Sequence, residues 1–177
     1  MPSRRRNSIA RRRAEEDDHR MTVREVPPQD WQTVRTARLA ALAGSAPGTF
    51  ATLLEEAQGW DEEHWKQWSA RRTMFVAESG TEVIGCAGGI REHGVPVLVS
   101  MFVEPAARGT GVSRALIEAV ADWARADGHA ELRLWVLDGN TPAEKLYRRM
   151  GFASTGVSRS TGVHAPDTEY EMSLALR

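Results

Sequence analysis

The sequence predicts an α+β domain, in which a mixed β-sheet carries helices on its faces. Two observations support this prediction. Strand-like and helix-like segments follow one another in the order strand, two helices, three strands, helix, strand, short helix, two strands. The stretch 95–105 is almost continuously apolar, which is typical of a central strand covered on both sides.

The first strand and the first helix are marked by alternation and by a cap. Residues 22–26, TVREV, alternate as a strand does, and the following PPQDW breaks the pattern. Asp30 is placed to cap a helix. That helix is expected to end at the GSAPG segment, 44–48, and to present one apolar face: Trp31, Val34, Ala37 and Ala41.

A weakly helical segment, 50–58, precedes a second clear helix. Residues 61–68 begin with acids, which suit the positive end of a helix dipole, and Trp65 and Trp68 share a face because they lie three apart. The turn-forming segments SGTE and REHG then separate three strands: 73–79, 82–90 and 95–105.

An amphipathic helix and an apolar strand come next. The helix is expected to end at ADG, 126–128, and five residues line its apolar side: Val112, Leu116, Ala119, Val120 and Trp123. Residues 130–138 form the following strand. Because a helix connects this strand to 95–105, the two strands are expected to be parallel neighbours.

The short helix 141–150 has unusually complete terminal signals. Thr141 and Glu144 are expected to form a capping-box pair, with Pro142 at the first helical position. Gly151 is placed to terminate the helix. Two more strands, expected to be antiparallel, complete the chain: 152–159 and 168–176.

Length and composition indicate a single globular domain at 21–177. The chain has 177 residues, of which 41% are apolar and 27% charged, and this suffices for one sizeable core. The formal net charge of −1 gives no bias toward nucleic acid or anionic membranes. No apolar run approaches the roughly 20 residues needed to span a bilayer. The single cysteine, Cys86, excludes an internal disulfide and is consistent with a reducing cytoplasm.

Residues 1–20 form a separate, highly charged segment. A basic block is followed by an acidic one with almost no apolar residues, so we expect a disordered tail. The tail lacks the apolar middle of a secretory signal. Met21 opens the strand-like MTVREV, and we expect it to be the natural start of the protein, which mass spectrometry of native material would test.

The turn before the amphipathic helix, RGTGVSR, is the strongest candidate binding feature. Glycines tolerate backbone angles that other residues resist, and the first amides of a helix have no partner within it. Together they suit an anion such as a pyrophosphate. The Walker ending GK[ST] is absent, and the third glycine of a dinucleotide fingerprint is replaced by Arg114. Taken alone, the turn is also compatible with no ligand.

The wider pattern resembles the GNAT superfamily of N-acetyltransferases. The resemblance is carried by FVEPAARGTGVSRALIEAVADWA and LRLWVLDGNTPAEKLYRRMGF, in which Asn140 and Tyr147 are seven residues apart. Ser113 stands where the family usually has glycine or alanine. The resemblance extends from about Thr22 to Leu176. It implies a mixed, mostly antiparallel central sheet with helices on both faces, and acetyl-CoA as the co-substrate.

The resemblance also implies roles for individual residues. Main-chain amides would hold the pyrophosphate, after Arg108 opens the motif: Gly109, Thr110, Gly111, Val112, Ser113 and Arg114. The backbone of Met101, Phe102 and Val103 would pair with the pantetheine arm. Asn140 would contact the cofactor, and Tyr147 would face the thioester sulfur and protonate the leaving thiolate. Apart from the resemblance, the position of Glu104 at the end of the central strand makes it the candidate general base, and an ordinary solvated carboxylate is the alternative.

The acceptor is expected to be a small-molecule or peptide amine. Acidic residues could attract it or could form an ordinary solvated helix face: Glu55, Glu56, Asp61, Glu62 and Glu63. Trp60, Trp65 and Trp68 could wall the acceptor side or pack the core. Cys86 is expected to be a core residue. The histidines show no metal-ligand spacing, so no metal is expected.

Two other functions stay open at this stage. A non-catalytic acyl-CoA sensor would keep the glycine turn without needing Tyr147. The arginine-rich tail could bind nucleic acid, although a solvated tail is the expectation. Neither a nucleic acid nor a membrane partner is therefore expected. A homodimer is plausible by analogy with the family.

Overall fold

Seven strands, five α-helices and one short 3₁₀ helix make up the part of the chain that the computed structural model describes, which is residues 21–46, 48–161 and 168–177. The strands are β1 Thr22–Val26, β2 Thr73–Ser79, β3 Glu82–Glu92, β4 Val95–Val103, β5 Glu131–Leu137, β6 Ala153–Ser160 and β7 Thr168–Ala175. The helices are α2 Trp31–Gly44, α3 Leu54–Gln58, α4 Glu62–Ala70, η1 Pro105–Ala107, α5 Val112–Ala126 and α6 Thr141–Arg149. The predicted disordered tail lies outside the described residues.

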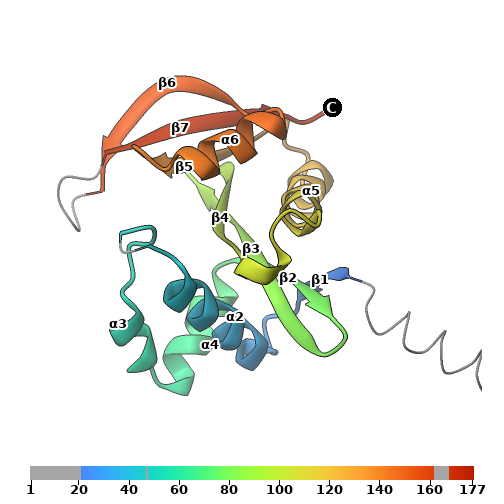
Figure 1. Ribbon diagram of the computed structural model, residues 1–177, viewed down its shortest axis with the longest axis vertical. Helices are drawn as coiled ribbons and strands as arrows, with labels where there is room; N and C mark the ends of the chain where they lie inside the picture. Colours follow the sequence, from blue (N-terminus) through green and yellow to red (C-terminus); the bar gives the residue numbers. More distant parts are fainter. Residues whose placement is uncertain (1–20, 47, 162–167) are drawn as a thin grey trace, which may run out of the picture.

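All seven strands belong to one sheet, in the order β1-β2-β3-β4-β5-β7-β6, so β4 is central as predicted. Only β4 and β5 are parallel, and all other neighbours are antiparallel. The connection between β4 and β5 runs through α5, which confirms the predicted crossover. Helices lie on both faces of the sheet (Figure 1). The predicted α+β fold class is confirmed.

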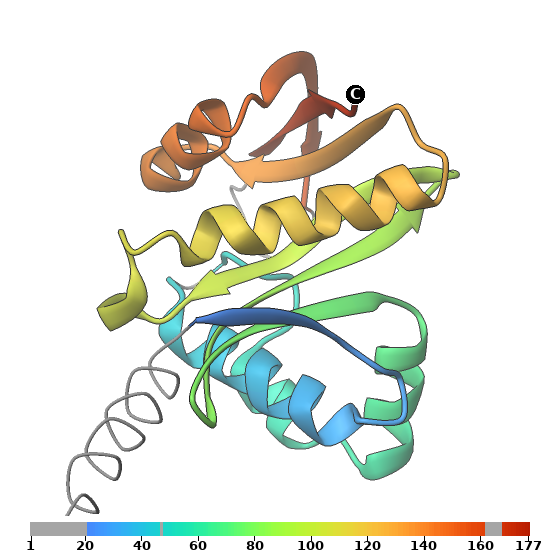
Figure 2. The same cartoon turned by 90° about the vertical axis from the view of Figure 1, so that its right-hand side faces the viewer.

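Helix α5 lies across one face of the sheet and encloses the larger core (Figure 2). Its fully buried side chains recur at helical spacing: Val112, Leu116, Ile117, Val120, Ala121 and Ala124. They pack against apolar residues of β2 to β5, and Tyr147 and Phe152 extend the same core beside α6. Of the five residues predicted to line the apolar side, Val112, Leu116 and Val120 are buried, whereas Ala119 and Trp123 are half-buried at its edge.

Helices α2 and α4 cover the opposite face with a smaller core. Val34, Ala37 and Ala41 of α2 pack there against Cys86 and Phe102 of the sheet. Cys86 is completely buried, which confirms that it is a core residue. On β4, Phe102 belongs to this core and the next residue, Val103, to the α5 core, because successive strand residues point to opposite faces.

Most predicted element ends lie within two residues of the observed ones. Three local details differ from the prediction. Strand β4 ends at Val103, because Pro105 begins the 3₁₀ turn η1. Only Leu54–Gln58 of the predicted segment 50–58 is helical. The predicted capping box was wrong: Asn140 is the N-cap of α6 and accepts from the Ala143 amide at 3.3 Å. Both Thr and Asn cap helices well, so sequence alone favours neither.

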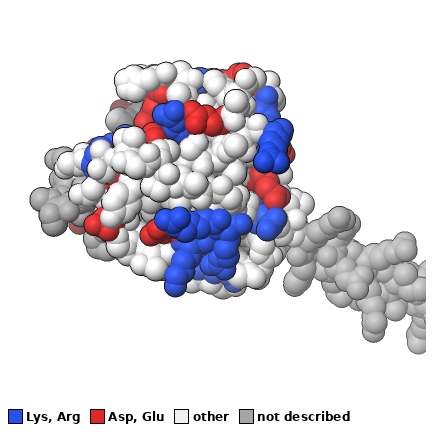
Figure 3. All heavy atoms as spheres, turned by 90° about the horizontal axis from the view of Figure 1, so that it is seen from above, with Lys and Arg blue, Asp and Glu red and all other residues white. Residues whose placement is uncertain are grey.

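On the face seen from above, a large group of Lys and Arg side chains lies at the lower edge, whereas elsewhere acidic and basic side chains lie next to one another around uncharged surface (Figure 3). Within the described residues, no helix is long and apolar enough to cross a membrane. The same part of the chain contains no group of three His, Cys, Asp or Glu side chains that could hold a metal ion.

Candidate functional site

The site begins where β4 leaves its neighbour β5. The two strands pair only at Val97–Leu98 with Arg133–Leu134, although both continue beyond this point. The register of β4 against β3 shifts near Ser100, which has a left-handed φ of 54°. Such a conformation is uncommon for a residue other than glycine and is typical of a β-bulge beside a functional site. The bulge and the lost pairing open the sheet at its centre.

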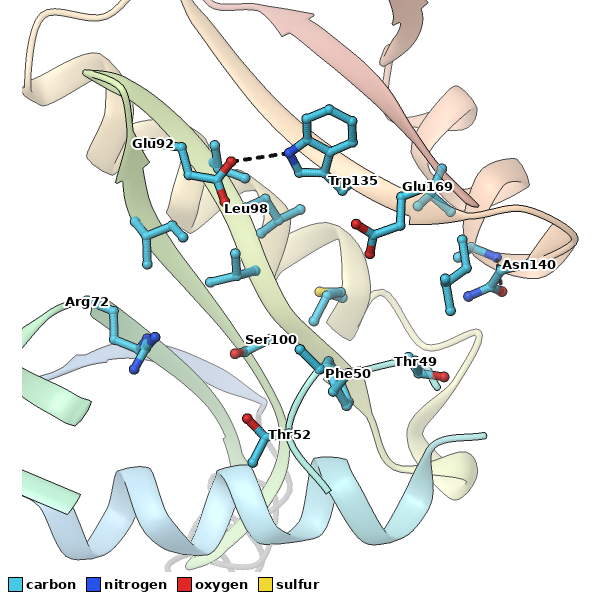
Figure 4. Close-up of a pocket in the computed structure, with 18 of the residues that line it drawn as sticks. Thr49, Phe50, Thr52, Arg72, Glu92, Leu98, Ser100, Trp135, Asn140 and Glu169 are labelled. Carbon is cyan, nitrogen blue, oxygen red and sulfur yellow. Dashed lines mark hydrogen bonds between the residues drawn. The ribbon is translucent and has the colours of Figure 1, made fainter. Parts of the chain in front are cut away.

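A cavity of about 320 Å³ occupies this opening. Its walls come from segments far apart in the sequence, namely the 49–52 loop, α2, α4, both splayed strands, α6 and the β6–β7 hairpin. Figure 4 shows Phe50 and Thr52 on one side, and Glu92, Trp135 and Glu169 on the other.

Tyr147 reaches this cavity from α6. Its side chain is 8% exposed, and its ring packs edge-on against Phe152 at a centroid distance of 5.8 Å. Burial raises the pKa of the Tyr147 phenol to about 12, because the phenolate would lose its hydration. The hydroxyl therefore keeps its proton at neutral pH and can donate it to a group in the cavity.

Asn140 lines the same cavity from the start of α6. Its side-chain oxygen is occupied by the cap hydrogen bond to the Ala143 amide. This leaves the side-chain NH₂ group to donate to a ligand. The residue thus has a structural role that its predicted cofactor contact did not include.

The glycine turn lies between η1 and α5 and presents backbone amides to solvent. Gly109 and Gly111 have φ of 78° and 95°, which only glycine adopts readily, and Gly111 is the N-cap of α5. The first intrahelical bond runs from the Ala115 amide to the Gly111 carbonyl, so the amides of residues 112–114 precede the ladder. They are candidate donors to an anion at the positive end of the helix dipole.

The side chains around the turn have different roles from its amides. Val112 is 1% exposed in the α5 core, so only its backbone can meet a ligand. Arg108 folds back, and its Nε donates to the Val103 carbonyl at 3.1 Å. Thr110 donates to the Ala107 carbonyl, and Arg114 pairs with Glu118 at the surface. Ser113 is half-buried at the second position of α5.

Residues Met101, Phe102 and Val103 follow the bulge on β4, on the stretch without a β5 partner. The Met101 side chain lines the cavity, whereas those of Phe102 and Val103 are buried in opposite cores. The backbone of this stretch is consequently the part available to pair with an extended ligand, as in strand addition.

Glu104 is not among the residues that line the cavity. It follows β4, and its carbonyl accepts from the Ala107 amide in η1. Two other carboxylates line the cavity, Glu92 at the end of β3 and Glu169 near the start of β7. Sequence reasoning missed both, because they lie 77 positions apart on β3 and β7, which are not neighbours in the sheet.

Arg159 holds these two carboxylates together. Its Nε donates to Glu169 at 2.9 Å, and its Nη1 lies 3.4 Å from Glu92. Its guanidinium stacks over the Trp135 ring at 3.9 Å, and the Trp135 indole donates to Glu92 at 3.3 Å. One wall of the cavity is thus an ordered polar network (Figure 4).

The opposite wall contains two arginines, the buried Arg38 of α2 and the half-buried Arg72 just after α4. Arg38 is 5% exposed and donates to the Ser100 hydroxyl at 3.2 Å. The Arg72 Nη1 donates to the Trp68 carbonyl at 2.7 Å. Sequence reasoning missed both residues. Arg38 left a readable signal, because a charge lies there on the apolar face formed by Val34, Ala37 and Ala41.

The structure shows which aromatic and acidic residues of α3, α4 and the segment between them line the cavity. Trp68 lines the cavity, whereas Trp65 is 1% exposed and packs in the interior. Trp60 stacks on His64 at 4.2 Å, away from the cavity lining. The five acids stay outside this lining: Glu55, Glu56, Asp61, Glu62 and Glu63. Asp61 caps α4 by accepting from the His64 amide at 2.8 Å.

Comparison with known proteins adds an independent line of evidence. The model of the family described as "Acetyltransferase (GNAT) family" matches residues 39–152. An IAA acetyltransferase of Azospirillum brasilense is 38% identical over 99 residues, which cover 54% of this chain and 61% of that protein. A streptothricin acetyltransferase of Streptomyces lavendulae is 43% identical over 70 residues, which cover 36% of this chain and 37% of that protein. The matches thus span less than two thirds of either relative.

A solved structure shares the fold. The protein yncA of Salmonella typhimurium, solved with its cofactor acetyl-CoA, superposes with a TM-score of 0.70 at 21% identity. The alignment covers 89% of this chain and 95% of that one. At this identity the likeness concerns the fold.

Proposed function

The chain belongs to the acetyltransferase (GNAT) family, and on this premise we propose that it is an N-acetyltransferase that transfers the acetyl group of acetyl-CoA to a primary amine. The observation that carries the proposal is the opening between β4 and β5, which joins a cavity lined by Tyr147 to the strand edge that leads to the glycine turn. A protein that only binds acyl-CoA would need the glycine turn but no proton donor. Tyr147 is a proton donor buried beside the cavity, which favours catalysis.

Acetyl-CoA would lie along the opened strand edge. The amides of residues 109–114 would bind its pyrophosphate, and the Met101–Val103 backbone would pair with the pantetheine arm. The Asn140 NH₂ group is placed to contact the same arm from the α6 side. This arrangement would bring the thioester into the cavity beside Tyr147.

Direct attack requires both reactants in the cavity at once. The amine nitrogen forms a bond to the thioester carbonyl carbon, and the tetrahedral oxyanion then expels the thiolate as the C–S bond breaks. Tyr147 would supply the proton that the thiolate takes up, because its phenol stays protonated at neutral pH. Holding the two reactants together would contribute a large part of the remaining rate enhancement.

The proton that the amine loses needs an acceptor. Glu104 stays a prediction for this role, and Glu169 is the alternative that its position in the cavity lining supports. Single variants Glu104→Gln and Glu169→Gln separate the two, because the rate should fall only in the variant that lacks the true proton acceptor.

Three further features stay proposals. We propose that residues 21–177 form a single catalytic domain and that a homodimer forms. We also propose a cytoplasmic location, which the one free, buried thiol of Cys86 supports.

Calorimetry with acetyl-CoA on a matched pair of glycine variants tests the proposal. Gly111→Val places a β-branched residue at a φ of 95° inside the predicted pyrophosphate site, and Gly128→Val places one at 82° just beyond the far end of α5. Both should lose stability, by about 1–2 kcal/mol. Only Gly111→Val should weaken acetyl-CoA binding, by tenfold or more.

Release of free thiol from acetyl-CoA across a panel of primary amines completes the test, with the acetylated amine identified by mass spectrometry. Saturable binding without thiol release would favour the acyl-CoA sensor. No saturable heat from the folded wild-type protein would refute the proposal.

A further inference from the structure

The cavity contains two cationic side chains that have no acidic partner among the described residues. Arg38 and Arg72 make no ion pair there, although twelve pairs occur elsewhere in that part of the chain. Each donates one hydrogen bond to a neutral oxygen, and the Nε of each is buried without a partner. Removing a cation from water without a counter-charge is costly, so the buried Arg38 and the half-buried Arg72 both need an explanation.

Aromatic rings hold both guanidinium groups in place. Trp68 lies between them, with ring-centroid distances of 5.4 Å to the Arg38 Cζ and 3.5 Å to the Arg72 Cζ. Phe50 lies 4.4 Å from the Arg38 Cζ. Stacking of this kind covers the guanidinium faces and leaves the N–H edges to bind a planar anion.

Both guanidinium groups stay charged at neutral pH. Burial lowers the pKa of Arg38 to about 10, and burial together with the nearby charge of Arg38 lowers the pKa of Arg72 to about 10. Both values remain well above neutral pH. The cavity's own carboxylates do not neutralise them, because Glu92 and Glu169 are bound by Arg159 on the opposite wall.

The cavity therefore has a cationic wall facing a wall that carries two carboxylates. In Figure 4 Arg72 lies across the cavity from Glu92 and Trp135, and Ser100, the partner of Arg38, lies at the base of the opening. A ligand with one anionic group and one amine fits this polarity. A neutral or purely cationic amine would leave both arginines without a partner.

We propose, on the basis of the acetyl transfer proposed above, that the acceptor is a small amine carrying an anionic group, which Arg38 and Arg72 bind while its amine lies toward Tyr147 and Glu169. A carboxylate, as in an amino acid, and a phosphonate or phosphate offer the same oxygen acceptors to a guanidinium edge. Arg38 and Arg72 would thus determine acceptor specificity.

The test compares acceptors that differ only in charge. Thiol-release rates are measured with amino acids, with the corresponding α-amides and with aminoalkyl phosphonates of similar length. The amide has the less basic amine, so reactivity alone would favour it at neutral pH. We expect the wild-type enzyme to prefer at least one anionic series over its neutral counterpart by about tenfold to a hundredfold in kcat/KM, because hydrogen bonds to charged groups are strong.

Arginine variants locate the preference. In Arg72→Met the ratio of anionic to neutral kcat/KM should fall toward one, mainly through KM, while the Kd for acetyl-CoA stays unchanged. Arg38→Met should act in the same direction. Arg125→Met is the matched control, since Arg125 pairs with Asp122 on α5 and does not line the cavity, and its ratio should equal the wild-type ratio. Circular dichroism confirms that each variant is folded.

The outcomes separate this inference from the proposed function. Equal use of anionic and neutral amines by the wild-type enzyme would overturn the inference and leave acetyl transfer intact, as would an unchanged ratio in a folded Arg72→Met. Transfer to no amine at all would refute the proposed function and the inference with it. Preference for the carboxylate or for the phosphonate series identifies the anion.

Discussion

Helix α5 and the pair α2 and α4 cover opposite faces of one sheet, but they bury different kinds of side chain (Figures 1 and 2). Every side chain that α5 buries is apolar. Helix α2 buries Arg38 among its alanines and valine, and Arg38 meets the bulged Ser100 of β4. One face therefore resembles an ordinary core, whereas the other contains polar groups whose burial lowers the stability of the fold.

The difference suggests a division of labour between the two faces. Apolar burial on the α5 side stabilises the fold without specifying any ligand. The α2 and α4 side has less of that stabilisation, because arginines, a bulge and a cavity replace part of the apolar packing. Because the sheet opens between β4 and β5, groups from both faces reach the same cavity, and Tyr147 reaches it from the α5 core.

The largest expected effect comes from Tyr147→Phe, which removes the proposed acid and keeps the ring that packs on Phe152. We expect kcat to fall on the order of 10²–10⁴-fold, with the Kd for acetyl-CoA and the melting temperature nearly unchanged. Tyr170→Phe is the control, because this second tyrosine does not line the cavity. An equal loss of rate in both variants, or none in Tyr147→Phe, would remove Tyr147 from the mechanism.

The next effect contrasts the two faces directly. Ile117 of α5 is fully buried, so Ile117→Ala should lower the free energy of unfolding by about 3 kcal/mol, through lost burial and the cavity left behind. Its KM for the acceptor should not change. Phe50 is half-buried and stacks on Arg38, so Phe50→Ala should cost less stability and raise KM for the acceptor.

Urea unfolding and steady-state kinetics on both variants provide the measurement. If Ile117→Ala raised the acceptor KM as much as Phe50→Ala, the proposed difference would be wrong. The α5 side would then affect acceptor binding as much as the α2 and α4 side.

What could be predicted from the sequence follows the same division. The position and orientation of α5 were predicted, because its apolar residues repeat at 3.6-residue spacing and the helix has clear signals at both ends, but only half of its buried residues were named. All seven strands and the parallel pair were also predicted, because alternation and crossover connections are local signals. The glycine turn was predicted because its left-handed residues are glycines.

The cavity and the α2 and α4 side were only partly predictable, because their contacts join segments that are distant in the sequence. The bulge at Ser100 depends on how β4 pairs with β3, and no residue type in the sequence indicates it. The network of Glu92, Arg159 and Glu169 exists only once the C-terminal hairpin lies beside the opening. Arg38 was readable as a charge on an apolar face, but its role depends on Trp68, thirty residues later.

The smallest expected effect concerns Cys86, which lies on the α2 side, where the apolar core meets polar groups. Its thiol is fully buried, and its Sγ lies 3.3 Å from the Ser100 carbonyl oxygen, to which it donates. Burial raises the pKa of the Cys86 thiol from 9.0 to about 12, because the thiolate would be desolvated. The unfolded chain therefore loses this proton first, so stability is full below pH 9 and falls as the pH rises toward 12.

Comparison of the wild-type protein with Cys86→Ala isolates this contribution. Between pH 8 and pH 10 the wild-type free energy of unfolding should fall by about 1.4 kcal/mol more than that of the variant. Urea titrations at each pH measure the difference, and stopping at pH 10 limits the contribution of Tyr147, whose pKa burial raises from 10.0 to about 12. Parallel pH profiles for the two proteins would mean that the thiol is hydrated in the folded state, and that the α2 side is more open to water than its packing indicates.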